Sequence, residues 1–155
     1  MLDEHVLVIR NQTTTHRSLH GFLRRHGYTV TETSNCVDTI KTLSIASMII
    51  LDMLKEKPSE EDISLIREIR DSGCMIPILV ITSSDSVDFR NKVEEFDIVS
   101  YISKPIDFIK IREEIKKGIT LTSKLKKLKT LSNNLSESLS KFILLVNKKE
   151  LVHSS

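Results

Sequence analysis

Five short runs of apolar, mostly branched residues recur along the first two thirds of the chain. Each run is apolar almost throughout, rather than at every second position. The runs are residues 6–9, 28–30, 48–52, 76–82 and 98–102. Continuous apolarity over so few residues is typical of strands that are buried on both faces, as in a parallel sheet with helices on each side. The pattern therefore predicts five parallel strands.

The stretches between these runs have the spacing of helices. Apolar residues three or four positions apart occur within residues 19–23, 37–43, 63–69 and 87–96. Each stretch is long enough for one helix and too short for two. Strands and helices that alternate in this way predict an α/β fold with a doubly wound, five-stranded parallel sheet and right-handed crossovers.

Polar side chains stand where three of the predicted strands end. Asp52 closes the third strand, Thr82 closes the fourth, and Lys104 follows the fifth. In a sheet of this type, the ligand or reaction site lies outside the carboxyl ends of the strands. A carboxylate there can attack phosphorus, and an ammonium group can hold the phosphoryl oxygens. The residues predict either a phosphoryl-accepting site or a structural ion pair at the rim of the sheet.

Three motifs in register closely resemble the receiver domain of two-component response regulators. They are LDM around Asp52, VITSSD around Thr82, and YISKP with Tyr101 and Lys104. The 30 residues from Asp52 to Thr82 and the 22 from Thr82 to Lys104 are the intervals of that family. The resemblance covers residues 4–118.

The resemblance implies the fold, the site and the partners. It implies a flavodoxin-like sheet with strand order 2-1-3-4-5. It makes Asp52 the phosphoacceptor, Lys104 and Thr82 its catalytic partners, and Thr82 and Tyr101 the switch residues. It also implies a cis peptide bond before Pro105. A protein of this kind is a cytoplasmic, bacterial phosphorelay component rather than an enzyme, and its partner is a histidine kinase or phosphotransfer protein.

One part of the family pattern is missing. Receiver domains place two adjacent acidic residues at the end of the first strand, where they hold Mg²⁺, and this chain has Arg10 and Asn11 there. Magnesium needs hard oxygen ligands, usually including carboxylates. The groups that remain for a weakly bound ion are Asn11, Asp52 and the backbone carbonyl of Leu54. The cofactor that the resemblance implies is therefore doubtful on the residues.

The replacement leaves two functions open. In one, Asp52 still accepts a phosphoryl group, with an impaired or altered dependence on Mg²⁺, because the guanidinium of Arg10 is a good partner for phosphoryl oxygens. In the other, the chain is a pseudo-receiver, a phosphorylation-independent scaffold for protein interactions. A simpler alternative for Arg10 is that its side chain reaches solvent and does not affect the site.

The helical pattern continues beyond the receiver-like region 1–118 into residues 119–155. Apolar residues step by threes and fours, with an irregular spacing between Leu128 and Leu135. They are residues 121, 125, 128, 131, 135, 139, 142 and 146. Such a row predicts an extended C-terminal helix that forms a coiled coil. The expected partner is a second copy, with parallel pairing as the simplest arrangement and the orientation left open.

Charge is unevenly divided. Residues 1–105 carry 12 Lys/Arg and 16 Asp/Glu, a balance of −4, whereas residues 106–155 carry 11 and 5, a balance of +6. The basic run 124–129 lacks a helix-turn-helix signature and interleaved aromatic residues. We therefore interpret it as the solvated face of the coiled coil rather than as a site for nucleic acid or a membrane surface.

Several other classes are excluded. No apolar run approaches the roughly 18 residues that a bilayer requires, and the N-terminus lacks the basic region of a signal peptide. Cys36 and Cys74 have the spacing of neither a metal site nor a disulfide framework, so both are expected to be reduced. His16 and His20 lie four apart without a third ligand, so we interpret them as polar surface residues.

Overall fold

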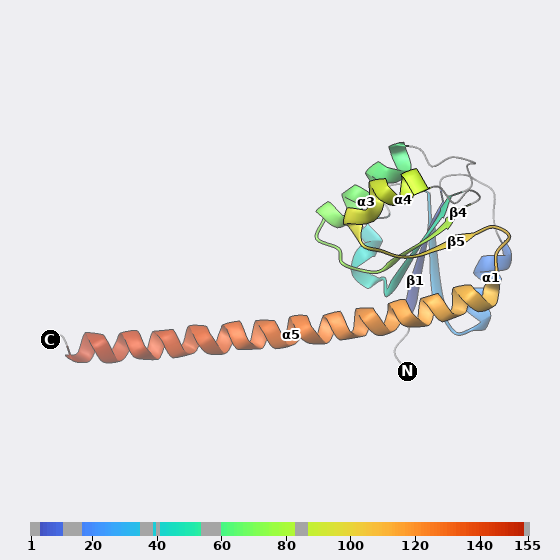
Figure 1. The fold of residues 1–155 in the computed structure, drawn as a ribbon. Coiled ribbons are helices and arrows are strands. Elements are labelled where there is room, and N and C mark those ends of the chain that lie inside the picture. Colours follow the sequence, from blue (N-terminus) through green and yellow to red (C-terminus); the bar gives the residue numbers. More distant parts are fainter. Residues whose placement is uncertain are drawn as a thin grey trace. The chain divides into compact units, whose positions relative to one another are not determined.

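The computed structural model describes residues 4–10, 17–34, 39, 41–53, 60–82 and 87–153. Five strands form one parallel sheet in the order β2-β1-β3-β4-β5 (Figure 1). They are β1 (His5–Arg10), β2 (Thr29–Thr33), β3 (Met48–Met53), β4 (Ile78–Thr82) and β5 (Ile98–Ser103). The predicted fold class, strand number and strand order are confirmed.

Helices connect the strands. They are α1 (Arg17–Arg25), η1 (Leu43–Ile45), α3 (Glu60–Asp71), α4 (Val87–Val93), η2 (Glu94–Phe96) and α5 (Phe108–His153), where η marks a 3₁₀ turn. The helix predicted over 87–96 is α-helical only to Val93. It tightens into η2 and ends at Asp97, which has the left-handed conformation with φ 55°. Of the helix predicted over 37–43, residues 37, 38 and 40 lie outside the described residues; residues 39, 41 and 42 are helical, and Leu43 begins η1.

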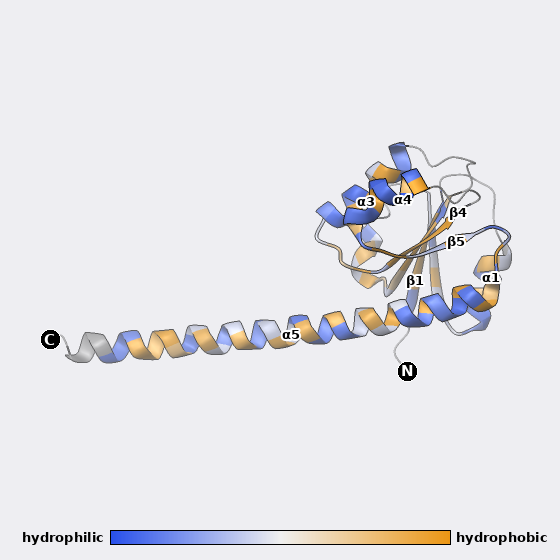
Figure 2. Cartoon of the chain, in the orientation of Figure 1, coloured by the Kyte–Doolittle hydropathy of each residue, from blue (hydrophilic) through white to orange (hydrophobic). Residues whose placement is uncertain are grey.

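The sheet has an apolar core on each face. On one side, Leu7 and Ile9 of β1 pack in a cluster with residues of α3 and α4, such as Ile66 and Phe89. On the other side, Val6 and Val8 belong to a cluster with residues of α1 and the start of α5. Figure 1 shows these helices on opposite sides of the sheet, and Figure 2 shows the apolar strands between them. Successive β1 residues thus pack into the cores on opposite faces of the sheet, which explains why the strand is apolar throughout.

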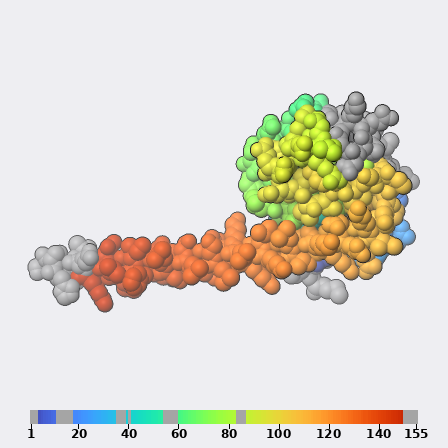
Figure 3. Space-filling view, viewed as in Figure 1, coloured from blue at the N-terminus to red at the C-terminus, as the bar shows by residue number. Residues whose placement is uncertain are grey.

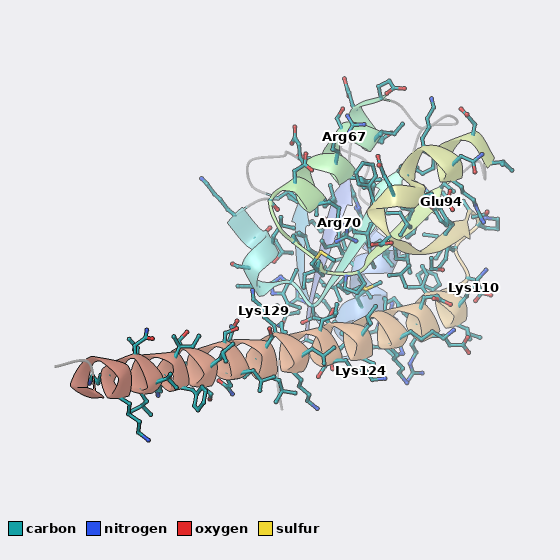
Figure 4. The ribbon with its side chains drawn as sticks, turned by 60° about the vertical axis from the view of Figure 1, so that its left-hand side comes forward. Arg67, Arg70, Glu94, Lys110, Lys124 and Lys129 are labelled. Carbon is teal, nitrogen blue, oxygen red and sulfur yellow. The ribbon has the colours of Figure 1, made fainter. Side chains whose placement is uncertain are left out.

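A partly buried guanidinium joins α3 to the segments that lead into β4 and β5. Arg70, labelled in Figure 4, donates to the backbone carbonyls of Phe96 at 2.8 Å, Ile76 at 2.8 Å and Cys74 at 3.0 Å. Burial lowers the pKa of Arg70 from its ordinary value, and the nearby Cys74 and Asp97 oppose that shift. The contacts satisfy backbone carbonyl groups at this edge of the sheet.

The chain divides into two compact units, Met1–Thr122 and Ser123–Ser155. The first unit includes the opening turns of α5, because Ile111 and Ile115 are fully buried and the Thr122 hydroxyl donates to the Ser47 carbonyl at 2.7 Å. This division lies a few residues beyond the boundary predicted at residue 118. Among the described residues, no helix combines the length and the apolar content that crossing a bilayer requires.

Gly118 lets α5 approach the sheet closely. A Cβ atom at this position would overlap the sulfur of Met48, whose side chain is fully buried in β3. Glycine within a helix costs about 1 kcal/mol relative to alanine. Here that cost is offset by the close packing of the helix on β3.

We predict that Gly118→Ala destabilises the protein by about 1–2 kcal/mol, because the added methyl group overpacks the core by more than the gain in helix propensity. In a Met48→Ala background, the same substitution is expected to stabilise the protein by up to about 1 kcal/mol. Urea unfolding of the four proteins measures both effects. An equal effect in the two backgrounds would contradict the proposed contact.

Candidate functional site

The site is built around a buried carboxylate at the end of β3. Asp52 has no solvent-exposed surface, and its neighbours in register are Arg10 on β1 and Ile81 on β4. Burial of an ionised carboxylate costs several kcal/mol unless other groups compensate its charge. The surroundings of Asp52 must therefore supply positive charge.

One compensating cation comes from the loop after β5. The Lys104 ammonium lies 3.1 Å from Oδ1 of Asp52. Its backbone N–H donates to the carbonyl of Thr82 at 2.9 Å, which fixes this loop beside the end of β4. The Lys104–Pro105 peptide bond is cis, as the family resemblance implied. The structure thus brings together two residues that are far apart in the sequence.

Thr82 lies on the strand next to Asp52. It is the register partner of Met53, the residue after Asp52, and it is only 2% exposed. The hydroxyl predicted to act with Asp52 therefore stands at the same edge of the sheet, on the neighbouring strand.

The second cation is Arg10. Its side chain is buried, with Nε 3.8 Å from Oδ2 of Asp52. The alternative in which Arg10 extends into solvent is therefore wrong. Its neighbour Asn11 lies outside the described residues, as does Leu54.

Sequence reasoning missed the residues on the far side of Arg10. Nη2 of Arg10 lies 3.3 Å from Oε1 of Glu32 on β2, and Nδ1 of His20 on α1 lies 3.0 Å from the same oxygen. His20 is therefore not merely a polar surface residue. The available signal was the strand order, because β2 lies beside β1 and an acidic residue near its end can reach Arg10.

The charged side chains of the site alternate in sign from one residue to the next. Lys104, Asp52, Arg10 and Glu32 form a series of cation, anion, cation and anion. Each buried charge therefore has a neighbour of opposite sign, which is the condition for keeping a carboxylate and a guanidinium inside a protein. The series joins β1, β2 and β3 to the loop that follows β5.

The described residues do not fit a magnesium site. A cation already faces each oxygen of Asp52, and a metal ion in the same place would be repelled by Arg10 and Lys104. Within the described parts of the chain, no group of three potential metal-ligating His, Cys, Asp or Glu residues is found. Arg10 stands at the sequence position where the family resemblance implied an acidic residue.

Tyr101, the predicted switch residue, is partly buried on β5 and contacts α4. Its ring meets that of Phe89 edge to face, with centroids 6.4 Å apart, and Cζ of Arg90 lies 4.6 Å from the ring centroid. Aromatic and cation–π contacts of this kind orient a ring. Any change in the position of Tyr101 would therefore alter its contacts with α4.

Comparison with known proteins is consistent with this geometry. Residues 6–116 match the family model described as "Response regulator receiver domain". The sporulation initiation phosphotransferase F of Bacillus subtilis is 22% identical over 125 residues, which cover 79% of this chain and 99% of that protein.

Two solved structures illustrate the shared fold. A CheY-like receiver domain protein from Methanospirillum hungatei has a TM-score of 0.67 at 17% identity, covering 79% of this chain and 98% of its own. The receiver domain of a sensor histidine kinase from Pseudomonas aeruginosa has a TM-score of 0.62 at 19% identity, covering 77% and 99%. That structure has a magnesium ion coordinated in its active-site cleft.

We predict a coupling of about 1–3 kcal/mol between Arg10 and Asp52 in a double-mutant cycle of Arg10→Met and Asp52→Asn, because each residue compensates a buried charge of the other. Urea unfolding of the single and double variants gives this value. The exposed pair Lys141–Glu137, 3.4 Å apart, is the control and is expected to show less than about 0.5 kcal/mol. Equal couplings in the two cycles would argue against a structural role for the buried pair.

Proposed function

Because the chain belongs to the response regulator receiver domain family, and so to two-component signalling, we propose that Asp52 accepts a phosphoryl group without a resident Mg²⁺ ion. Arg10 and Lys104 supply the positive charge in its place. The observation that carries this proposal is the pairing of both Asp52 oxygens with side-chain cations, at 3.8 and 3.1 Å. Receiver domains interact with histidine kinases or phosphotransfer proteins, and we infer that one of these is the donor.

The chemistry is a single transfer. An oxygen of Asp52 forms a bond to phosphorus while the bond between phosphorus and the donor imidazole nitrogen breaks, and the imidazole keeps the electron pair. We assign the attack to Oδ2, because its contact with Arg10 is the longer of the two ion-pair distances. The guanidinium can then hold two phosphoryl oxygens through parallel hydrogen bonds. The protein itself is proposed to act as an acceptor and not as an enzyme.

The signal would leave through β5 and α4. In this proposal, the Thr82 hydroxyl turns toward the new phosphoryl group and Tyr101 changes its position. The contacts of Tyr101 with Phe89 and Arg90 would then change as well, so the surface of α4 would carry the signal to a partner.

A second function is favoured by the burial of Asp52. The carboxylate is fully enclosed, so a donor reaches it only after the site rearranges. A pseudo-receiver would need no such rearrangement, and its fixed ion pairs would hold one conformation as a scaffold for protein interactions. The two functions differ in whether Asp52 ever carries a phosphoryl group.

The region after the receiver domain is proposed to mediate dimerisation. The apolar row from Leu121 to Val146 is exposed along its length, with exposed fractions from 36% at Leu125 to 71% at Leu135. Figure 3 shows one face of the molecule, on which side chains of this part of α5 lie at the surface. A row of this size on a helix is an association surface. We propose that a second copy covers it, and we place the protein in the cytoplasm, where two-component partners meet.

We predict that incubation with a small phosphodonor, such as phosphoramidate, adds one phosphoryl group to the intact chain in the absence of Mg²⁺. Asp52→Ala abolishes the added mass, because it removes the nucleophile. Intact-protein mass spectrometry measures the adduct. If no adduct forms with or without Mg²⁺, the scaffold function is correct instead.

A companion variant shows whether the charge replacement sets the metal dependence. The double substitution Arg10→Asp and Asn11→Asp introduces the acidic pair that the family uses, so its adduct should form at least tenfold faster with Mg²⁺ than without it. The wild-type protein should change by less than twofold. A wild-type rate that depends equally on Mg²⁺ would refute the proposed role of Arg10.

We also predict that Leu135→Lys with Leu139→Lys converts the dimer to a monomer, because the added charges would be buried in the apolar seam. The matched control carries Asn133→Lys and Ser140→Lys on the outer face of the helix and should remain dimeric. Light scattering of the full chains measures the mass. A monomeric wild-type protein would show that the seam does not join two copies.

A further inference from the structure

The exposed part of α5 follows one heptad register. Position a of the repeat holds Leu125, Ser132, Leu139 and Val146, and position d holds Leu121, Leu128, Leu135 and Phe142. Leu131 stands one residue before the polar a position at Ser132, and this accounts for the irregular spacing of the apolar row. Because α5 is a continuous helix, these side chains form a single seam along it. Figure 2 shows apolar and polar residues alternating along this stretch.

Lysines flank the seam at its beginning. Four of the six residues 124–129 are lysine, and residues 123–130 contain no acidic residue. Lys124 is at position g and Lys129 at position e, the positions that border a coiled-coil seam. Both are labelled on α5 in Figure 4. Their charges therefore lie at the border of any interface that covers the seam.

A parallel pair would place like charges together. In parallel coiled coils, position g of one helix faces position e of the next heptad of the other. Lys124 of each copy would then face Lys129 of its partner, so this contact would occur twice. The two runs 124–129 would also lie side by side, with eight ammonium groups and no carboxylate between them. Such pairings are repulsive, and the register offers no compensating anion at this level.

An antiparallel pair avoids this repulsion. If Leu125 packs opposite Phe142 of the other copy, Leu128 faces Leu139 and Leu121 faces Val146, whereas Leu135 meets the polar Ser132. The lysine run then lies beside residues 138–143 of the partner. The one charged side chain in that segment, Lys141, is paired with Glu137 at 3.4 Å.

The end of the helix supports the same orientation. Residues 142–146 are apolar without interruption, and Leu144 and Leu145, which lie off the seam, are 61% and 60% exposed. In the antiparallel register, Leu145 lies beside Lys124 of the partner, whose alkyl chain can cover it while the ammonium group stays in water. An apolar residue therefore faces a basic one at the position where a parallel pair would place two lysines.

We propose that the seam of α5 binds a second copy of this chain in antiparallel orientation. The proposal rests on the proposed dimerisation and adds its geometry. It places the apolar end of each helix beside residues 121–125 of the partner, the segment in which α5 leaves the first unit. The two receiver units are then joined to opposite ends of the paired segments.

Disulfide trapping in the full chain tests the orientation. Cys36→Ser and Cys74→Ser remove the native thiols, and Leu125→Cys or Phe142→Cys then adds a single one. In the antiparallel pair, the two thiols introduced at position 125 are 17 residues apart along the axis, or about 25 Å, so Leu125→Cys alone should form no covalent dimer. A mixture of the two single-cysteine proteins should form a covalent heterodimer on mild oxidation. Denaturing gel electrophoresis without reductant measures both results.

Three results would overturn the inference, and they separate it from the proposed dimerisation. A covalent dimer of the Leu125→Cys protein alone shows a parallel pair. If light scattering shows a dimer but neither the Leu125→Cys protein nor the mixture forms a covalent dimer, the two copies associate through another face of the chain. A monomer by light scattering overturns the dimer itself, and the seam would then fit a different protein as its partner.

Discussion

The site depends on a carboxylate that is buried between two cations. Asp52 is fully enclosed at the end of β3, and an ionised group in that position is tolerated only when opposite charge lies close to it. Lys104 and Arg10 supply that charge from opposite sides, and both reach it from neighbouring parts of the same sheet edge. Apolar strands packed between two helical layers enclose the Asp52 carboxylate, and the ion pairs offset the cost of burying its charge. Removal of either cation would leave the buried carboxylate with only one of its two ion pairs, which costs more than the loss of an exposed ion pair.

The proposed replacement of a metal ion by a side chain would change how the site responds to its surroundings. A bound Mg²⁺ ion exchanges with solution, so its occupancy depends on concentration, whereas a guanidinium is covalently part of the chain. Arg10 is also held by Glu32, which limits the directions in which it can move. The cation beside Asp52 is therefore supplied by the chain itself. This arrangement suits an acceptor that works without a metal ion, and it equally suits a scaffold whose conformation does not change.

The sequence was sufficient to predict those features that depend on local pattern. Continuous apolar runs predicted the five strands, and the ends of three strands predicted that Asp52 and Lys104 would meet. The Arg10–Glu32 pair was not predicted. It depends on which residue of β2 lies beside β1, and that register follows from packing of the whole sheet rather than from either segment alone. For the same reason, the direction of the Arg10 side chain stayed open until its neighbours were known.

The ion-pair series has one end at the surface. His20, on α1, is about one-third exposed, and it contacts the same Glu32 oxygen that Arg10 contacts. Three side chains from α1, β2 and β1 therefore connect solvent to the enclosed carboxylate. The surface of α1 is thus linked to Asp52 by three side-chain contacts, so a ligand bound at His20 would touch the outer end of the series that reaches the enclosed carboxylate.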